Sequence, residues 1–393
     1  MRSRADSALV VGAGLAGLVA ADELQAAGVE TVVLEARDRV GGRVWSRRLD
    51  NGAVVEMGAE FLLPGNTAIR ELEARFGLGL WDKGMRYGMR EPRGVEVTPE
   101  QLAAAVQAAN AAMASAPPEQ NARQFLDGLD IAPGARESLL ARTEISSANS
   151  ANLVAARDLG GIAHVDEEPA PSIANGNQSL PMALAERLDV RLNRRVERVE
   201  WGADGVRAGE LEVDLCVIAV PASRLDQIEF DPVLPAQAAE PLGRVVYGAA
   251  AKLFVPLTEP APPSAVMAVT ERYWTWTATG AGDQPQPVVS CFAGSPGALK
   301  GLEVDNGPER WLASLAALRP DLALDPDGAL LSTWPRGAYS TSPPPELAGL
   351  AAHPVGPLAF AGEHLGGAYA ALMEGAIRSG RAAAQGLLIR TGT

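Results

Sequence analysis

The amino-acid sequence predicts an α/β protein with two domains, one built around a parallel sheet and one around an antiparallel sheet with a helical insertion. Three observations lead to this prediction. The chain begins with a strand, a glycine-rich turn, a helix and a second strand. Its 393 residues exceed what one compact domain usually holds. Residues 246–292 alternate apolar and polar side chains, which is typical of antiparallel strands.

The glycine-rich turn carries Gly12, Gly14 and Gly17 between a β-branched strand over 8–11 and an Ala/Leu-rich helix over 15–27. The first glycine permits a tight turn, the second lets the backbone approach a pyrophosphate, and the third allows close packing of the helix on the strand. The helix N-terminus adds uncapped N–H groups and a partial positive charge. The turn therefore predicts a phosphate-binding site.

A second strand over 31–34 ends at Glu35, eighteen residues after Gly17. An acid at this place completes the dinucleotide-binding fingerprint, because its carboxylate accepts hydrogen bonds from ribose hydroxyls. The same charge disfavours the 2′-phosphate of NADP. The glycine turn alone leaves NAD and FAD both open.

The remaining pattern predicts a nucleotide-binding sheet assembled from the first, middle and last thirds of the chain. No strand pattern interrupts residues 81–175, so this block is expected to be a helical insertion that takes no part in a sheet. We expect a nucleotide-binding domain from residues 1–80, 176–235 and 346–393, and a substrate domain from 81–175 and 236–345. The expected helices are 68–76, 100–114, 121–129, 134–145, one within 176–188, and 373–388; the expected strands are 54–57, 190–192, 196–201, 211–213, 215–220 and 358–361.

Composition excludes several classes of function. A net charge of −14 disfavours nucleic acid, whose phosphates would be repelled. The three histidines, His164, His353 and His364, are not spaced as metal ligands, so no metal site is expected. Cys216 and Cys291 form neither a metal-spaced pair nor a disulfide framework, and Cys216 is expected in the core. No Gly-x-Ser-x-Gly elbow supports a hydrolase.

The sequence also predicts neither a signal peptide nor a membrane-spanning helix. Arg2 and Arg4 precede an apolar run, but no cleavage site follows, and cleavage would destroy the glycine fingerprint. No window of about 18 apolar residues is present. We therefore expect a soluble cytoplasmic protein without a membrane partner.

Residues 35–43, Glu-Ala-Arg-Asp-Arg-Val-Gly-Gly-Arg, resemble the second flavin motif of the amine oxidase family, which includes monoamine, polyamine and L-amino-acid oxidases. Further resemblances follow in the family's chain order at 57–60, 195–199, 360–364 and 373–380. They imply a glutathione-reductase-like Rossmann domain that binds FAD. The implied FAD-binding residues are Gly12, Ala13, Gly14, Leu15, Ala16, Gly17, Glu35, Ala36, Arg37, Gly41, Gly42, Arg43, Met57, Gly58, Ala59, Glu60, Val196, Gly362, Glu363, Met373 and Ala376.

The resemblance also implies roles within this set. Arg43 is expected to bond the diphosphate and Arg37 the adenosine side. Val196 is expected to meet the adenine through its backbone, and Glu363 to contact the ribityl-phosphate region. The helix from Met373 is expected to direct its N-terminus at the flavin, where it stabilises negative charge.

Two residues are expected to take part in catalysis. Lys252 matches the family lysine that faces flavin N5 through a water, where a cation favours the reaction with oxygen. Tyr339 matches the first wall of an aromatic cage that holds the amine against the flavin. Ala338 stands where monoamine oxidase has its flavin-linking cysteine, so non-covalent FAD is expected.

The expected substrate contacts are Leu372, Trp334 and Phe61. Leu372 falls at the second wall of the cage, which makes the cage half aromatic, and Trp334 precedes Tyr339 by five residues. Phe61 occupies the position at which L-amino-acid oxidases hold a substrate carboxylate with arginine. This favours amines over amino acids, unless Arg86 or Arg90 reaches in from the substrate domain.

The resemblance implies oxidation of an amine. Hydride would pass from the amine α C–H to FAD N5, the imine would hydrolyse to an aldehyde or ketone, and O₂ would reoxidise the flavin to give hydrogen peroxide. Two alternatives are kept: a flavin-dependent desaturase or dehydrogenase of an apolar intermediate, and a flavin-binding protein with little turnover. The amine, the electron acceptor and the oligomeric state are left open, with a homodimer as one option.

Overall fold

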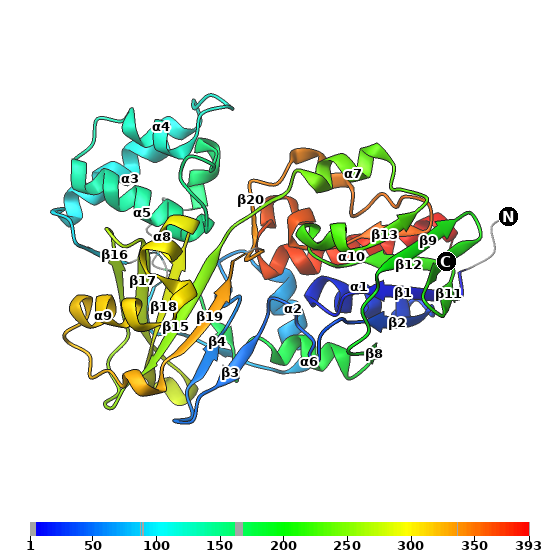
Figure 1. The fold of residues 1–393 in the computed structure, drawn as a ribbon, viewed down its shortest axis with the longest axis horizontal. Helices are drawn as coiled ribbons and strands as arrows, with labels where there is room; N and C mark the ends of the chain where they lie inside the picture. The colour runs from blue at the N-terminus through cyan, green and yellow to red at the C-terminus, as the bar shows by residue number, and fades with distance from the viewer. Residues whose placement is uncertain (1–4, 87, 89, 162–167, 336, 393) are drawn as a thin grey trace.

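The computed structural model describes residues 5–86, 88, 90–161, 168–335 and 337–392, so the prediction for His164 lies outside the described residues. A five-stranded parallel sheet gathers strands from distant parts of the chain, as the sequence predicts (Figure 1). Its order is β21 (Leu358–Phe360), β12 (Leu215–Ile218), β1 (Ser7–Val11), β2 (Glu30–Leu34) and β8 (Asp189–Arg191).

Both faces of the parallel sheet are covered, which explains why its strands are almost continuously apolar. One face packs on helices α1 (Leu15–Ala26), α2 (Thr67–Phe76), α6 (Ser179–Ala185) and α10 (Met373–Thr391). The other packs on helix α7 (Ala236–Gly243) and on a four-stranded sheet in the order β11 (Leu211–Val213), β10 (Gly205–Ala208), β9 (Arg198–Gly202) and β13 (Glu229–Asp231). Cys216 is fully buried in this second core, as predicted.

Helices α1 and α10 pack so closely that a side chain is excluded between them. A Cβ at Gly380 on α10 would lie 2.3 Å from the carbonyl oxygen of Ala16 on α1. The buried carboxylate of Glu374 on α10 accepts hydrogen bonds from the N–H groups of Ala68 and Ile69, and thereby caps the first turn of α2. These contacts fix where the N-termini of α1 and α10 lie.

A second, six-stranded sheet runs in the order β19 (Leu330–Trp334), β15 (Ala250–Pro256), β18 (Pro285–Gly294), β17 (Tyr273–Thr279), β16 (Ser264–Ala268) and β6 (Glu91–Arg93). Neighbouring strands are antiparallel as expected, except β6 and β16, which are parallel. Helix α9 (Glu309–Leu318) lies at the sheet's left side in Figure 1 and helix α8 (Pro296–Gly301) near its upper end, and α9 buries Trp311 against one face.

The expectation that residues 81–175 take no part in a sheet is wrong. Strand β6 forms one edge of the six-stranded sheet, and β7 (Ser172–Ile173) pairs with β5 (Leu80–Trp81). Both strands are too short to display an alternating pattern of apolar and polar side chains. Strand β6 also contains Pro92, a residue that argues against a strand in the sequence but is tolerated at the edge of a sheet. The remaining short pairs are β3 (Ser46–Arg48) with β4 (Val54–Glu56) and β14 (Val246–Tyr247) with β20 (Ser340–Thr341).

The predicted helical insertion is present as α3 (Pro99–Met113), α4 (Ala122–Asp127) and α5 (Pro133–Ser147). Capping boxes at Thr98 and Asn121 start the first two helices, since each side chain accepts from the backbone N–H three residues on. Figure 1 shows the three helices together above the six-stranded sheet.

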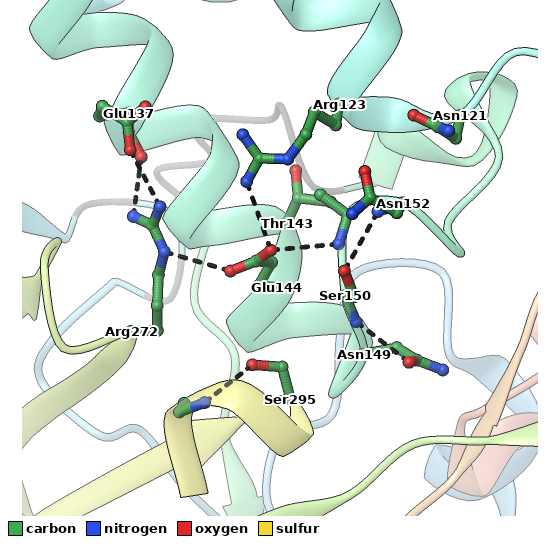
Figure 2. A network of polar contacts seen from close by, with 12 residues as sticks. Asn121, Arg123, Glu137, Thr143, Glu144, Asn149, Ser150, Asn152, Arg272 and Ser295 are labelled. Atoms are coloured by element: carbon green, nitrogen blue, oxygen red, sulfur yellow. Dashed lines mark hydrogen bonds and ion pairs between the residues drawn. The ribbon is translucent and has the colours of Figure 1, made fainter. Parts of the chain in front are cut away.

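A partly buried polar network fastens α5 to the six-stranded sheet (Figure 2). Arg272, between β16 and β17, pairs with Glu137 at 2.9 Å and with Glu144 at 3.1 Å, both on α5. Glu144 also accepts from the N–H of Ala151 at 3.2 Å, just beyond the helix. The network therefore fixes the C-terminal end of α5, which reaches the site described below.

No helix within the described ranges is long and apolar enough to cross a membrane.

Candidate active site

A cavity of about 1040 Å³ lies where the two large sheets meet. On one side it is lined by residues at the carboxyl ends of parallel strands, including Gly12, Glu35 and Ala219. On the other side it is lined by Lys252, Trp274 and other side chains of the six-stranded sheet. Ligands bind α/β proteins most often at this edge of the parallel sheet.

The glycine turn closes one end of the cavity. A Cβ at Gly17 would lie 2.0 Å from the carbonyl oxygen of Gly12, so the turn requires glycine there for packing alone. A Cβ at Gly14, in contrast, would meet no protein atom within 4 Å. Gly14 caps α1 without a side-chain hydrogen bond, which leaves the N–H groups of the first turn for a ligand.

Glu35 lies beside the glycine turn on the same wall, with only 8% of its surface exposed. Its two carboxylate oxygens accept backbone N–H groups, from Ala13 at 2.8 Å and from Arg37 at 2.9 Å. The carboxylate is therefore held in one orientation. Its remaining lone pairs suit hydroxyl donors such as those of a ribose.

An ion pair joins the second glycine motif to the C-terminal motif. Arg43 Nη1 lies 2.7 Å from Glu363 Oε1, and Glu363 also accepts from the hydroxyl of Ser340 at 2.5 Å and from the N–H of Ala371 at 2.9 Å. Burial by itself raises the pKa of Glu363, but the charges of Arg43 and His364 and the hydrogen bonds from Ser340 and Arg43 together outweigh burial and hold the pKa below its usual value. Glu363 is thus an anion that fixes Arg43 at the cavity wall.

Strand register brings three side chains to one face of the six-stranded sheet, and only Lys252 among them was predicted as a site residue. Lys252 on β15 and Trp274 on β17 both stand opposite Phe292 on β18, so all three point the same way and line the cavity. Lys252 therefore lies on an inner strand, 5% exposed, and not on the solvent face of an edge.

The ammonium of Lys252 belongs to a buried ion cluster. Its Nζ donates to the carbonyl oxygen of Glu56 at 2.7 Å and to Glu60 Oε2 at 2.8 Å, and Lys83 binds the other oxygen of Glu60 at 3.2 Å. Burial by itself raises the pKa of Glu60, but the two lysines lower it below its usual value. An ammonium has three donors, and the described residues accept two of those of Lys252, which leaves one for a molecule in the cavity.

The buried carboxyl of Glu56 stands next to this cluster. Its oxygens accept from the Ser46 hydroxyl at 2.7 Å and from the N–H of Asn177 at 2.8 Å. Burial raises the pKa of Glu56 to about 7, because the nearby Lys83 only partly offsets the desolvation of the carboxylate.

Aromatic side chains form the wall around Lys252. The indoles of Trp274 and Trp276 stack with centroids 4.1 Å apart, and Phe61 packs against them at 5.7 and 5.8 Å. Tyr339 donates its hydroxyl to the carbonyl oxygen of Ser146 at 2.9 Å, at the end of α5. Trp334 donates its indole N–H to the carbonyl oxygen of Met57 at 2.8 Å.

Among the 26 predicted site residues, 24 line this one cavity. The two that do not, Ala13 and Gly17, are buried behind the glycine turn, where they hold its shape. Val196 lines the cavity but lies just before strand β9, which begins at Arg198 and not at residue 196 as predicted. The described residues contain no group of His, Cys, Asp or Glu that could hold a metal.

Sequence reasoning missed part of the lining, Lys83, and the ion pairs that join Lys252 and Lys83 to Glu60. The missed lining residues include Arg39, Trp45, Arg194, Arg195, Val220, Pro221, Ser223, Arg224, Ile145, Ser146, Trp274, Trp276 and Phe292, whereas Arg90, which was named as an arginine that could reach in, does line the cavity. Val220 and Pro221 follow a predicted buried strand, so their place at its carboxyl end could have been expected. The partnership of Lys83 with Glu60 has no sequence signal, because nothing in the spacing brings these residues together.

The cavity thus joins a phosphate-binding turn and Glu35 to a chamber lined by aromatic side chains and Lys252, an arrangement that suits an oxidoreductase with a dinucleotide cofactor. The chain belongs to the family of flavin-containing amine oxidoreductases, whose pattern matches residues 15–171 and 97–388. A relative from Mycobacterium tuberculosis, AofH, provisionally named a flavin-containing monoamine oxidase, is 26% identical over 96% of this chain and 95% of its own.

Solved structures share the fold. Cyclohexylamine oxidase from Brevibacterium oxydans IH-35A superposes with a TM-score of 0.82 at 21% identity, over 99% of this chain and all of its own. Putrescine oxidase bound to putrescine gives a TM-score of 0.80 at 24% identity, over 98% of this chain and 99% of its own. At these identities the likeness is one of fold.

Two glycine substitutions should separate folding from cofactor binding. We expect Gly14→Val to fold with a far-UV spectrum like that of the wild type but to lose flavin, because its side chain points into open cavity. Gly17→Val should fail to accumulate as folded protein, because its side chain collides with the backbone of Gly12. Flavin absorbance per mole of purified protein checks the first expectation, and a normal flavin content in Gly14→Val would contradict it.

Glu56→Gln should change how stability depends on pH. Since the folded pKa of Glu56 is raised, its contribution is fully present below the usual pKa of a free glutamate and is lost as pH rises through about 7. The loss should amount to roughly 3 kcal/mol, from about 1.4 kcal/mol per pKa unit. Urea titrations at pH 4.5 and 8 should therefore show wild type losing more stability than Glu56→Gln; equal losses would contradict the expectation.

Proposed function

We propose that this protein is an FAD-dependent amine oxidase that binds FAD without a covalent link and uses O₂ as electron acceptor. The observation that carries the proposal is one continuous cavity, which joins the glycine turn and Glu35 at one end to Lys252, Tyr339 and the aromatic wall at the other. FAD, when bound, would supply the hydride acceptor for the amine α C–H and return the electrons to oxygen as hydrogen peroxide.

The residues of the nucleotide end suit FAD. The first turn of α1 offers N–H groups to a diphosphate, and the side chain of Arg43 adds a guanidinium at the wall. Glu35 suits the hydroxyls of a ribose and disfavours a 2′-phosphate. Cavity-lining residues near the start of α10, Met373 and Ala376, support a helix N-terminus directed at the flavin, where it would stabilise negative charge.

The positions of the strands along the chain support the proposed division into an FAD-binding domain and a substrate domain. All five strands of the parallel sheet fall within 1–80, 176–235 and 346–393, the proposed FAD-binding domain. All six strands of the larger antiparallel sheet fall within 81–175 and 236–345, the proposed substrate domain. This supports a discontinuous Rossmann-type domain interrupted by two insertions.

At the substrate end the chain would bind and orient a neutral amine. Tyr339 and Leu372 both line the cavity and are proposed to flank the amine, with Phe61 and the stacked indoles excluding water. The third donor of Lys252 would hold a water or oxygen at a fixed point, because Glu60 and the Glu56 carbonyl fix the other two. Its charge would stabilise the anion that forms as oxygen is reduced.

The central test is anaerobic mixing of the purified yellow protein with primary, secondary and polyamines. At least one amine should bleach the flavin absorbance within seconds, and admission of air should restore the colour and release hydrogen peroxide. Bleaching by no amine in the panel would overturn amine oxidation and favour a desaturase or a protein with little turnover.

The flavin should leave the protein intact on denaturation. Ala338 offers no thiol for a flavin link, so heat or acid should release FAD into the supernatant, where its chromatographic retention and mass identify it. Yellow colour that stays with the precipitate would contradict non-covalent binding.

Lys252→Met should separate the two half-reactions. Hydride transfer from the amine does not need the charge of Lys252, so anaerobic reduction should change only a fewfold. Reoxidation by oxygen should slow by about 10- to 1000-fold, since each 1.4 kcal/mol of lost stabilisation costs about tenfold. Stopped-flow traces of each half-reaction check this, with Lys300→Met, an exposed lysine on α8, as the charge-matched control.

Lys83 still neutralises Glu60 in the Lys252→Met variant, so the cluster should stay folded. Equal slowing of both half-reactions, or of neither, would remove Lys252 from the reacting centre.

A further inference from the structure

A second lysine holds the carboxylate that pairs with Lys252. Lys83 follows strand β5 and is 5% exposed, the same fraction as Lys252. Its Nζ lies 3.2 Å from Glu60 Oε1, while Lys252 Nζ lies 2.8 Å from Glu60 Oε2. Lys252 and Glu60 line the cavity, whereas Lys83 is not among the lining residues. Lys83 can therefore influence the cavity only through Glu60 and through its charge.

The backbone holds Lys83 against the six-stranded sheet. Its carbonyl oxygen accepts from the N–H of Thr279, at the end of β17, at 2.9 Å. The hydroxyl of Thr279 donates to the carbonyl oxygen of the preceding residue, Asp82, at 2.8 Å. The carboxylate of Asp82 pairs with Arg86 at 3.2 Å. The segment that carries Lys83 is thus joined to the sheet that carries Lys252, and its acidic neighbour has a cation of its own.

The net charge beside the aromatic wall depends on Lys83. Among the described residues, eight arginine and lysine side chains line the cavity against three glutamates, and Lys252 is the one lysine of that set. Its partner Glu60 has a pKa below the usual value and is an anion, so this pair by itself has no net charge. Lys83 adds one positive charge next to the same carboxylate. The excess charge at this point of the cavity therefore comes from a residue that does not line it.

Glu56 is a further ionisable group of this cluster. Its carboxyl accepts from the Ser46 hydroxyl and from the N–H of Asn177. Burial raises the pKa of Glu56 to about 7, because the charge of Lys83 and these hydrogen bonds only partly offset the desolvation, and the charge of Glu60 adds to the rise. The cluster therefore carries one net positive charge below about pH 7 and none once Glu56 has ionised.

We propose that Lys83 is a positioning residue, which fixes Glu60 and supplies the net positive charge that the reacting centre presents to the flavin. Ionised Glu56 cancels that charge in alkaline solution. The inference rests on the proposed amine oxidase function, which places Lys252 at the reacting centre, and it deepens that function. Without Lys83 the centre is a neutral ion pair, which stabilises developing negative charge less than a net cation does.

Sulfite tests the charge of the holoenzyme without an amine. This anion adds reversibly to a bound flavin and bleaches its absorbance, so its dissociation constant measures how well the site holds an added negative charge. At pH 6, Lys83→Met should bind sulfite about tenfold more weakly than wild type. The midpoint potential of its flavin should fall by about 30 mV, which is tenfold for a two-electron couple. Lys83→Gln, which keeps a donor for Glu60, should show the same loss, and Lys83→Arg, which keeps the charge, should stay within a fewfold.

A double variant separates charge from structure. Lys83→Met combined with Glu60→Gln removes both ion pairs but again leaves one positive charge, on Lys252. Its sulfite affinity at pH 6 should therefore return to within a fewfold of wild type. A purely structural role predicts the opposite, because the double variant loses more contacts than Lys83→Met alone. Lys300→Met, which removes an exposed lysine on α8, should leave sulfite affinity and flavin potential unchanged.

The pH dependence of sulfite binding tests the contribution of Glu56. Wild type and Glu56→Gln should have equal dissociation constants at pH 6, where the carboxyl of Glu56 is protonated. At pH 8.5 Glu56→Gln should bind about tenfold more tightly, because only wild type has gained the cancelling charge. Both proteins meet the same mixture of sulfite and bisulfite, so the ratio of their constants isolates the charge of Glu56.

Three results would each overturn the proposal. These are unchanged sulfite affinity and flavin potential in Lys83→Met and Lys83→Gln, affinity in the double variant as weak as in Lys83→Met, and a ratio between wild type and Glu56→Gln that is the same at both pH values. Failure of the underlying function is distinguishable. In that case no amine reduces the flavin of wild type, while the sulfite and potential measurements, which need only bound flavin, still report the charge of the cluster.

Discussion

Close approach of backbone to backbone, with no side chain between, is the constraint on which this molecule depends. Gly17 seats α1 against the turn at Gly12, and Gly380 seats α10 against α1 at Ala16. Because these distances are fixed by glycines, both helices begin at the same cavity, and their N–H groups and partial charges point into one volume. A methyl group at Gly17 would push α1 away from the turn, and one at Gly380 would push α10 away from α1. In either case the two helix N-termini would no longer point into the same cavity.

The second organising feature is electrostatic. Burying an ammonium costs several kcal/mol unless partners compensate it, and Lys252 is compensated by a carboxylate that a second lysine also holds. The cluster of two lysines and Glu60 therefore keeps one net positive charge beside the aromatic wall without leaving any member unpaired. Its geometry is rigid, because Glu60 is bridged on both oxygens.

Local patterns predicted the parts of the fold that local rules determine. The glycine turn, an Ala/Leu-rich helix expected at 15–27, a helix expected at 373–388 and an apolar strand expected at 215–220 all form, at 15–26, 373–391 and 215–218, because each has a composition typical of its element. Strand β6 was missed because three residues are too few to show alternation. Helix α9 was missed although Trp311 and Leu315, its buried residues, recur at helical spacing. In the site, residues within motifs were predictable, whereas Lys83 owes its position beside Glu60 to packing between separate segments, which no spacing encodes.

The excess of cations around the cavity has a consequence for the life of the protein in the cell. Eight positive side chains line the cavity against three glutamates, and this excess of like charge costs stability that an anionic cofactor would restore. Under the proposed function, binding FAD would raise the free energy of unfolding by mass action, in proportion to the logarithm of its free concentration. Flavin supply would then govern how much of this protein escapes proteolysis, and abundance would follow the vitamin that feeds the cofactor.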